Sequence, residues 1–252
     1  MKIILLDMRK LCSKSIFWLK FTCYFVILAL VIEISGIYFS KSEEYSSAAV
    51  SAAEKLTVII DAGHGGEDCG AIGANGVYEK DLNLEVALLL GSMLSQRGYA
   101  VVYTRTTDRL LYTEEENIKG IRKISDLKNR CKIGAENPYA IFVSIHMNTY
   151  SSPQYSGLQV YYGIKNESSY ALGTSIQTAV KAELQENNKR CVKSGNNLYL
   201  LENLDNVAVL IECGFISNEA ECEKLCEKEY QKQLCFTILC GIIDYVNSFT
   251  SD

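Results

Sequence analysis

The chain from about residue 56 onward alternates short apolar runs with longer amphipathic stretches. Short apolar runs between turn residues are typical of strands, whereas apolar positions recurring every three or four residues are typical of helices. The predicted strands are 56–61, 99–105, 139–148, 156–163, 197–203 and 207–215. The predicted helices are 80–98, most of 113–135, 169–187 and a closing region that is capped by Ser217 or Asn218 and runs to about Phe249.

Several of these strands lack polar alternation, which indicates that both of their faces are buried. The pattern predicts an α/β fold: a single domain with a twisted, largely buried mixed β-sheet flanked by helices on both faces. With 252 residues, of which 48% are hydrophobic, the chain can bury one sizeable core. We assign that core to a catalytic domain at 56–252.

The N-terminal part of the chain has a different character. Residues 1–20 carry a net charge of +4, which leaves −9 for the rest of a chain whose total is −5. Residues 21–39 are apolar apart from Glu33 and a few small polar residues, and about twenty such residues span a bilayer. We therefore predict a basic cytoplasmic head (1–20), a transmembrane signal-anchor (21–39) and a polar linker (40–55).

A cleaved signal peptide is the alternative interpretation of the same segment. The small residues at 51–53 resemble a cleavage site, although they lie more than ten residues beyond the apolar run. Both interpretations place the catalytic domain outside the cytoplasmic membrane. The overall charge is mildly acidic and gives no reason to expect a nucleic-acid partner.

Ten cysteines in an exported protein raise the question of disulfides. Their positions in apolar segments favour burial as small hydrophobic side chains for most of them. Cys222 and Cys226 are one helical turn apart and have metal-ligand spacing, but no second pair completes such a site.

The chain has only two histidines, and both follow apolar strands. His64 lies in the glycine-rich loop after 56–61, and His146 is near the end of 139–148. Open α/β sheets build their sites at the carboxyl ends of strands. A lone histidine there is often structural, but two of them favour metal ligation.

Two glutamates occupy matching places. Glu79 opens the helix after the glycine-rich loop, where a negative charge is also favourable for purely structural reasons. Glu212 directly follows five apolar strand residues, so we expect it to be partly buried and to need a proton or a cation nearby. Two imidazoles and one carboxylate are a usual ligand set of hydrolytic zinc, and a second carboxylate can act as a base.

Four blocks of sequence carry a resemblance to a known family. They are VIIDAGHGGEDCGAIGANGVYEKDLNLEVA (58–87), VVYTRTTD (101–108), FVSIHMN (142–148) and LENLDNVAVLIECGFISNEAE (201–221). In this order they resemble the zinc-dependent N-acetylmuramoyl-L-alanine amidases (amidase-3 family) of bacterial cell walls, over roughly 56–249. Val207 departs from the family pattern, which commonly has proline there.

The resemblance implies roles for specific residues. His64, Glu79 and His146 match the ligands of a single Zn²⁺, and Glu212 matches the catalytic glutamate. The implied reaction is hydrolysis of the amide between N-acetylmuramic acid and L-alanine of the peptidoglycan stem peptide.

Four further residues have less specific expectations. Arg105 and Asp108 match a family-typical pair that we expect to form an ion pair at the rim of the site. Asn148 is expected either to bind substrate or merely to end its strand. Glu85 should face away from Glu79.

A compact catalytic domain behind a short anchor is most similar to the germination-specific, spore-cortex amidases of endospore formers. That likeness implies a role in forming muramic δ-lactam at the forespore envelope. Whether a regulatory protein or a second copy of the chain binds to it is left open by the sequence.

Two alternative functions stay open. One is a zinc exopeptidase or deacetylase acting on the cell wall, although such enzymes often use two metals and more carboxylates. The other is a catalytically silent peptidoglycan-binding scaffold, which would be marked by loss of Glu212 or of a ligand; all four residues are present.

Overall fold

The computed structural model describes residues 28–33, 35 and 55–249. The fold below is that of the unit Lys55–Asp252. The predicted head at 1–20 and most of the predicted anchor and linker lie outside the described residues. Within the described part of the chain, no helix has both the length and the apolar character needed to cross a membrane.

One six-stranded sheet forms the centre of this unit, in the order β2-β1-β3-β6-β4-β5. The strands are β1 (Thr57–Ala62), β2 (Ala100–Tyr103), β3 (Ile141–Asn148), β4 (Gln159–Tyr162), β5 (Lys193–Ser194) and β6 (Val207–Phe215). Strands β2, β1, β3 and β6 are parallel, whereas β4 runs antiparallel to β6. The sheet is therefore mixed, as the sequence predicted.

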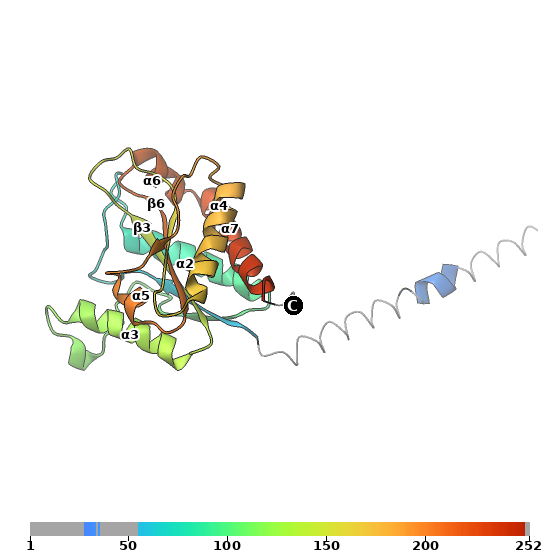
Figure 1. Cartoon of the computed structure of the whole chain (residues 1–252), viewed down its shortest axis with the longest axis horizontal. Helices are drawn as coiled ribbons and strands as arrows, with labels where there is room; N and C mark the ends of the chain where they lie inside the picture. Colours follow the sequence, from blue (N-terminus) through green and yellow to red (C-terminus); the bar gives the residue numbers. More distant parts are fainter. Residues whose placement is uncertain (1–27, 34, 36–54, 250–252) are drawn as a thin grey trace, which may run out of the picture. The chain divides into compact units, whose positions relative to one another are not determined.

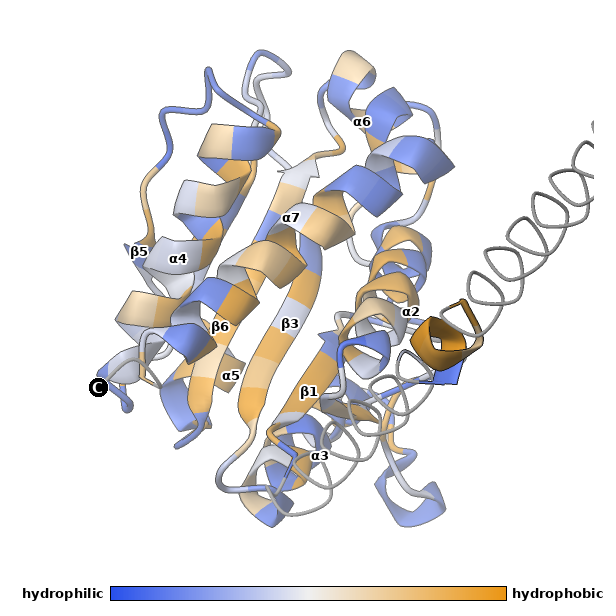
Figure 2. Cartoon of the chain, turned by 90° about the vertical axis from the view of Figure 1, so that its right-hand side faces the viewer, coloured by the Kyte–Doolittle hydropathy of each residue, from blue (hydrophilic) through white to orange (hydrophobic). Residues whose placement is uncertain are grey.

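Helices cover both faces of this sheet. On one face lie α2 (Glu79–Gln96), α4 (Ser168–Glu183) and α7 (Lys228–Asn247), and Figure 2 shows α4 and α7 in front of β6 and β3. On the other face lie α3 (Arg122–Glu136), which follows the short 3₁₀ helix η1 (Glu114–Glu116), and α5 (Tyr199–Asn203) (Figure 1). Helix α6 (Glu219–Cys226) follows β6.

The alternation of side chains along the strands divides the core in two. Val58 and Ile60 belong to the larger core, beneath α2, α4 and α7, whereas Ile59 and Phe142 belong to a smaller core on the side of α3 and α5. Toward the carboxyl ends of the strands, positions on this second face change from apolar to polar. They are occupied by Asp61 in β1, Ser144 and His146 in β3, and Glu212 in β6.

The main error of the sequence prediction is the segment 197–203, which is the helix α5 and not a strand. Leu200, Leu201 and Leu204 are buried together in the smaller core, a spacing that suits a helical turn. A short apolar run does not by itself distinguish a strand from a helix. The two-residue strand β5 was not predicted. The predicted cap is confirmed, because the Asn218 side chain accepts a hydrogen bond from the Glu221 backbone N–H.

Candidate metal and catalytic site

His64 lies in the loop that follows β1, and its backbone has an unusual conformation. Its φ of 61° is in the left-handed region, which residues other than glycine seldom adopt. The preceding Gly63 packs directly against the His146 ring, and a Cβ there would collide with the imidazole. The glycine therefore lets the two histidines approach, with ring centroids 4.9 Å apart.

Glu79 is the first residue of α2 and is almost completely buried. Its Oε1 lies 3.2 Å from His64 Nε2 and 3.0 Å from His146 Nδ1. The same carboxylate accepts hydrogen bonds from the backbone N–H groups of Met147 and Ala71. Glu79 thus bridges the two histidines and is anchored to the backbone.

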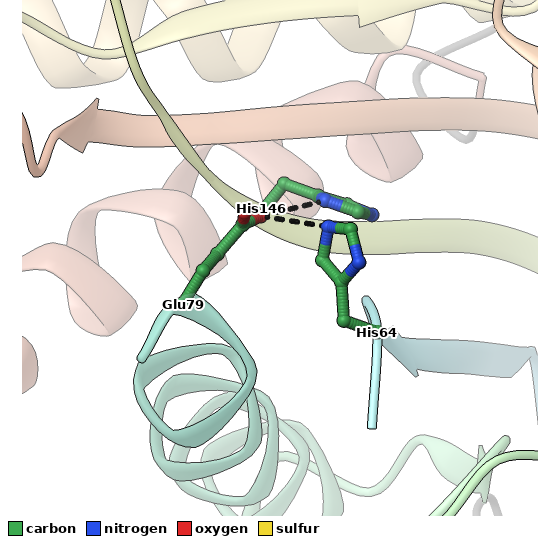
Figure 3. Close-up of side chains that lie close together, drawn as sticks. All are labelled: His64, Glu79 and His146. Atoms are coloured by element: carbon green, nitrogen blue, oxygen red, sulfur yellow. Dashed lines mark hydrogen bonds and ion pairs between the residues drawn. The ribbon is translucent and has the colours of Figure 1, made fainter. Parts of the chain in front are cut away.

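The three side chains converge from separate elements, as Figure 3 shows: the loop after β1, the first turn of α2, and β3. One potential ligand atom from each of His64, Glu79 and His146 lies within 4.8 Å of the others. Two imidazoles and one carboxylate are the donor set of hydrolytic zinc sites, so the residues present fit that ion.

The electrostatics of the cluster favour a cation. Burial by itself would lower the pKa of His64, but its hydrogen bonds with Asp68 and Glu79 outweigh burial and raise the pKa to about 9. Burial would likewise raise the pKa of Glu79, yet the two histidines hold it well below its ordinary value. The Glu79 carboxylate therefore stays charged and attracts positive charge.

Glu212 lies beside this cluster. It is the direct register partner of His146 across β3 and β6. Its Oε2 is buried and has no hydrogen-bond partner among the described residues. Burial, with a contribution from Glu79, raises the pKa of Glu212 to about 7 against the opposing influence of the histidines. Such a carboxyl group can accept or donate a proton near neutral pH.

Asp68 contacts a predicted ligand and was missed by sequence reasoning. Its Oδ2 lies 2.9 Å from His64 Nδ1, on the other side of the ring from Glu79, and 3.2 Å from Lys123 Nζ. A carboxylate in this position fixes the orientation of a ligating histidine. Its place four residues after His64 in the glycine-rich loop was the one signal that could have drawn attention to it.

Arg105 and Asp108 do not form the expected ion pair. Arg105 is buried and donates hydrogen bonds to four backbone carbonyls: Ala62, Gly63, Lys80 and Thr107. Asp108 instead pairs with Lys80 at 2.6 Å and accepts a hydrogen bond from Gly66 N–H. The prediction was wrong in its detail because it ignored Lys80 and the backbone of the glycine-rich loop.

Glu85 and Asn148 have simpler surroundings. The Glu85 carboxylate lies 2.8 Å from Lys228 Nζ and accepts a hydrogen bond from Gln231 in α7, so it faces away from the site as predicted. The Asn148 carbonyl accepts a hydrogen bond from Ile216 N–H, and a role for its side chain toward substrate stays a prediction.

The eight cysteines that the structure describes are all free, and Cys213, Cys222 and Cys235 are buried. Cys69, Cys131, Cys226 and Cys240 are partly buried, and Cys191 is exposed. Burial is thus confirmed for three of them in full.

A His–Glu–His cluster with a further carboxylate beside it, at the carboxyl ends of parallel strands, defines the class of site found in metal-dependent hydrolases. Comparison with known proteins identifies the family. The sequence model of the N-acetylmuramoyl-L-alanine amidases (Amidase_3) matches residues 58–244. The chain belongs to this family and is a peptidoglycan amidase.

Its relatives include the germination-specific N-acetylmuramoyl-L-alanine amidase of Bacillus subtilis, which is 32% identical over 92% of this chain and 95% of the relative. The CwlD amidase from Clostridioides difficile, solved in complex with the GerS lipoprotein, is 38% identical over 77% of this chain and all of that chain, with a TM-score of 0.74. AmiC2 of Nostoc punctiforme is 30% identical over 78% of this chain and 99% of that chain, with a TM-score of 0.66. The exopeptidase or deacetylase alternative is therefore set aside.

Proposed function

We propose that His64, Glu79 and His146 bind one Zn²⁺ and that Glu212 is the catalytic base of the amidase reaction. The observation that carries this proposal is the convergence of the three ligand atoms within 4.8 Å of one another. Glu212, with a buried oxygen that lacks a partner among the described residues, is the register neighbour of His146. The substrate bond is the amide between the lactyl group of N-acetylmuramic acid and L-alanine.

Zinc, when bound, supplies Lewis acidity at the scissile carbonyl. Glu212 takes a proton from the attacking water as the water oxygen bonds to the carbonyl carbon. When the carbon–nitrogen bond breaks, Glu212 delivers this proton to the leaving amine of L-alanine. The buried Oε2 of Glu212, which lacks a partner among the described residues, is available for both transfers.

The metal is tested by chelation and reconstitution of the purified protein. We expect a chelator to abolish release of stem peptides from peptidoglycan, and one equivalent of zinc to restore it. Mass spectrometry of the products checks that the released peptides begin with a free L-alanine amine. Full activity in a protein shown to be free of metal would contradict the proposal.

The setting that we propose is the spore cortex, where removal of stem peptides prepares muramic acid for conversion to its δ-lactam. The support is the likeness to a germination-specific amidase along nearly the whole of both chains. Expression in a spore former that lacks its own germination-specific amidase tests this setting. Restored muramic δ-lactam in the cortex is the expected result, and its continued absence despite accumulated protein would contradict it.

The N-terminal segment at 21–39 is our proposed membrane anchor, supported by its apolar composition and basic flank. A partner is also part of the proposal, because the CwlD relative was solved in complex with a lipoprotein. Fractionation of cells that express the full chain tests the anchor. Co-purification with the tagged chain tests the partner, because it distinguishes a bound lipoprotein from a second copy of this chain.

A further inference from the structure

Arg130 of α3 is a buried charge that the reaction does not use directly. Its side chain is 1% exposed. The guanidinium donates to Asp126 Oδ2 at 2.8 Å, to the Asp61 carboxylate, and to two backbone carbonyls of the loop that carries the first histidine. These carbonyls belong to Ala62, at 2.8 Å, and His64, at 2.9 Å.

A second buried guanidinium holds the same loop. Arg105 donates to Ala62 O at 2.9 Å and to Gly63 O at 3.0 Å. Three consecutive carbonyls, from Ala62 to His64, are therefore each bound to a buried arginine. Among the residues that the structure describes, Arg130 is the one donor to the His64 carbonyl.

The hydrogen bond from Arg130 restrains His64, whose backbone conformation would otherwise relax. A φ of 61° is costly for a histidine and persists only where the surroundings enforce it. In this conformation the His64 ring reaches Glu79 on one side and Asp68 on the other. A loop released from Arg130 would populate conformations in which the ring points elsewhere.

Arg130 belongs to a buried network of hydrogen bonds that includes its partner Asp61. Asp61 is completely buried and also accepts hydrogen bonds from Ser144 Oγ at 2.6 Å and Thr104 Oγ1 at 2.7 Å. Buried ion pairs seldom stabilise a fold more than apolar residues of similar size would. A charged network in the smaller core is thus better explained by the geometry that it imposes on the loop.

We propose that Arg130 is a positioning residue that sets the zinc affinity of the site by holding His64 in its ligating conformation. The inference rests on the proposed function only in taking His64 as a zinc ligand. Because the restraint comes from hydrogen bonds within the protein and not from the metal, zinc binding need not supply the free energy of ordering the loop.

The test is the zinc affinity of the full-length Arg130→Lys variant, measured by competition with a chromophoric chelator. Lysine keeps the charge but cannot reach Asp126, Ala62 and His64 together. We expect affinity to fall by about 10- to 100-fold, the range typical of residues that orient metal ligands. Leu201→Ala is the matched control, since it opens the smaller core without removing a hydrogen bond to the loop.

Folding of each variant is checked by circular dichroism, so that affinities are compared between folded proteins. Wild-type affinity in a folded Arg130→Lys variant would overturn the proposal. An equal loss in Leu201→Ala would also overturn it, because affinity would then follow stability alone.

Asp126→Asn serves where Arg130→Lys does not fold. This substitution keeps Arg130 and keeps an acceptor for the Leu111 N–H. It removes the negative charge that pairs with the Arg130 guanidinium and so weakens that contact. A smaller fall in zinc affinity is expected, and an unchanged zinc affinity would overturn the proposal.

Failure of the proposed function gives a different result: a wild-type protein that binds zinc and releases no stem peptide. A wild-type protein that binds no zinc would overturn both.

Discussion

His146 in β3 and Glu212 in β6 are direct partners in the register of two adjacent parallel strands. Both are on the face of the sheet where apolar positions give way to polar ones toward the carboxyl ends of the strands. The sheet therefore places a proposed metal ligand next to the proposed base without help from a flexible loop. Glu79 and His64 come to this pair from α2 and from the loop after β1.

The ligand role of Glu79 predicts a clear contrast within one helix. Glu79→Gln should weaken zinc binding by more than the roughly 100-fold that loss of a residue hydrogen-bonded to a metal ligand costs, because the proposed ligand itself is removed. Glu85→Gln is the matched control, since Glu85 contacts α7 and not the metal site. Zinc content after gel filtration checks this, and equal zinc content in the two variants would contradict the ligand assignment.

Asp68 should affect the metal through His64. Asp68→Asn removes a charge that orients the imidazole, so we expect zinc affinity to fall about 10-fold with little change in folding. Glu67→Gln is the neighbouring control, because Glu67 pairs with Arg122 at 2.6 Å. Chelator competition on both variants is the measurement. A fall in zinc affinity in both variants, or in neither, would show that Asp68 does not act through His64.

The raised pKa of His64 predicts opposite effects of pH on the metal-free and zinc-bound proteins. In the metal-free protein its pKa is about 9, against an ordinary value of 6.5. The resulting stabilisation, on the order of 3 kcal/mol, is fully present below pH 6.5 and is lost as pH rises through 9. Zinc competes with the same proton, so zinc affinity should instead increase over this range.

Denaturant unfolding of the chelated protein at several pH values measures the first effect. The comparison is the difference between wild type and His64→Asn, which cancels other titrating groups. Their difference in unfolding free energy should shrink between pH 6.5 and 9. A constant difference would show that His64 is not protonated in the metal-free fold.

Five of the six strands, and the gathering of His64, Glu79, His146 and Glu212 at one edge of the sheet, were predictable because each leaves a local signature. A histidine or glutamate at the end of a run such as AIFVSI or VAVLI is conspicuous against its apolar neighbours. The residues that support them leave no such signature. Arg130 lies in a charged helix, 66 positions from the His64 carbonyl that it binds, and only the tertiary fold brings the two together.

Two predictions from the sequence were wrong because tertiary contacts decided the outcome. The segment at 197–203 is apolar enough for a strand, and only burial of Leu200, Leu201 and Leu204 beneath α3 makes a helix the better solution. Arg105 was expected to form an ion pair with Asp108 because the two match a family-typical pair. Instead, the Arg105 guanidinium donates hydrogen bonds to backbone carbonyls of the loop after β1, and Asp108 forms an ion pair with Lys80.

The most direct test of the account is the Glu212→Gln variant, loaded with zinc and compared with wild type on purified peptidoglycan. Glutamine keeps the shape of the side chain but cannot carry the proton from water to the leaving amine. We expect zinc to stay bound at one equivalent while release of peptides with an L-alanine amino terminus falls by about 10²- to 10⁴-fold. Release at the wild-type rate by a zinc-loaded variant would contradict the assignment of Glu212 as the base.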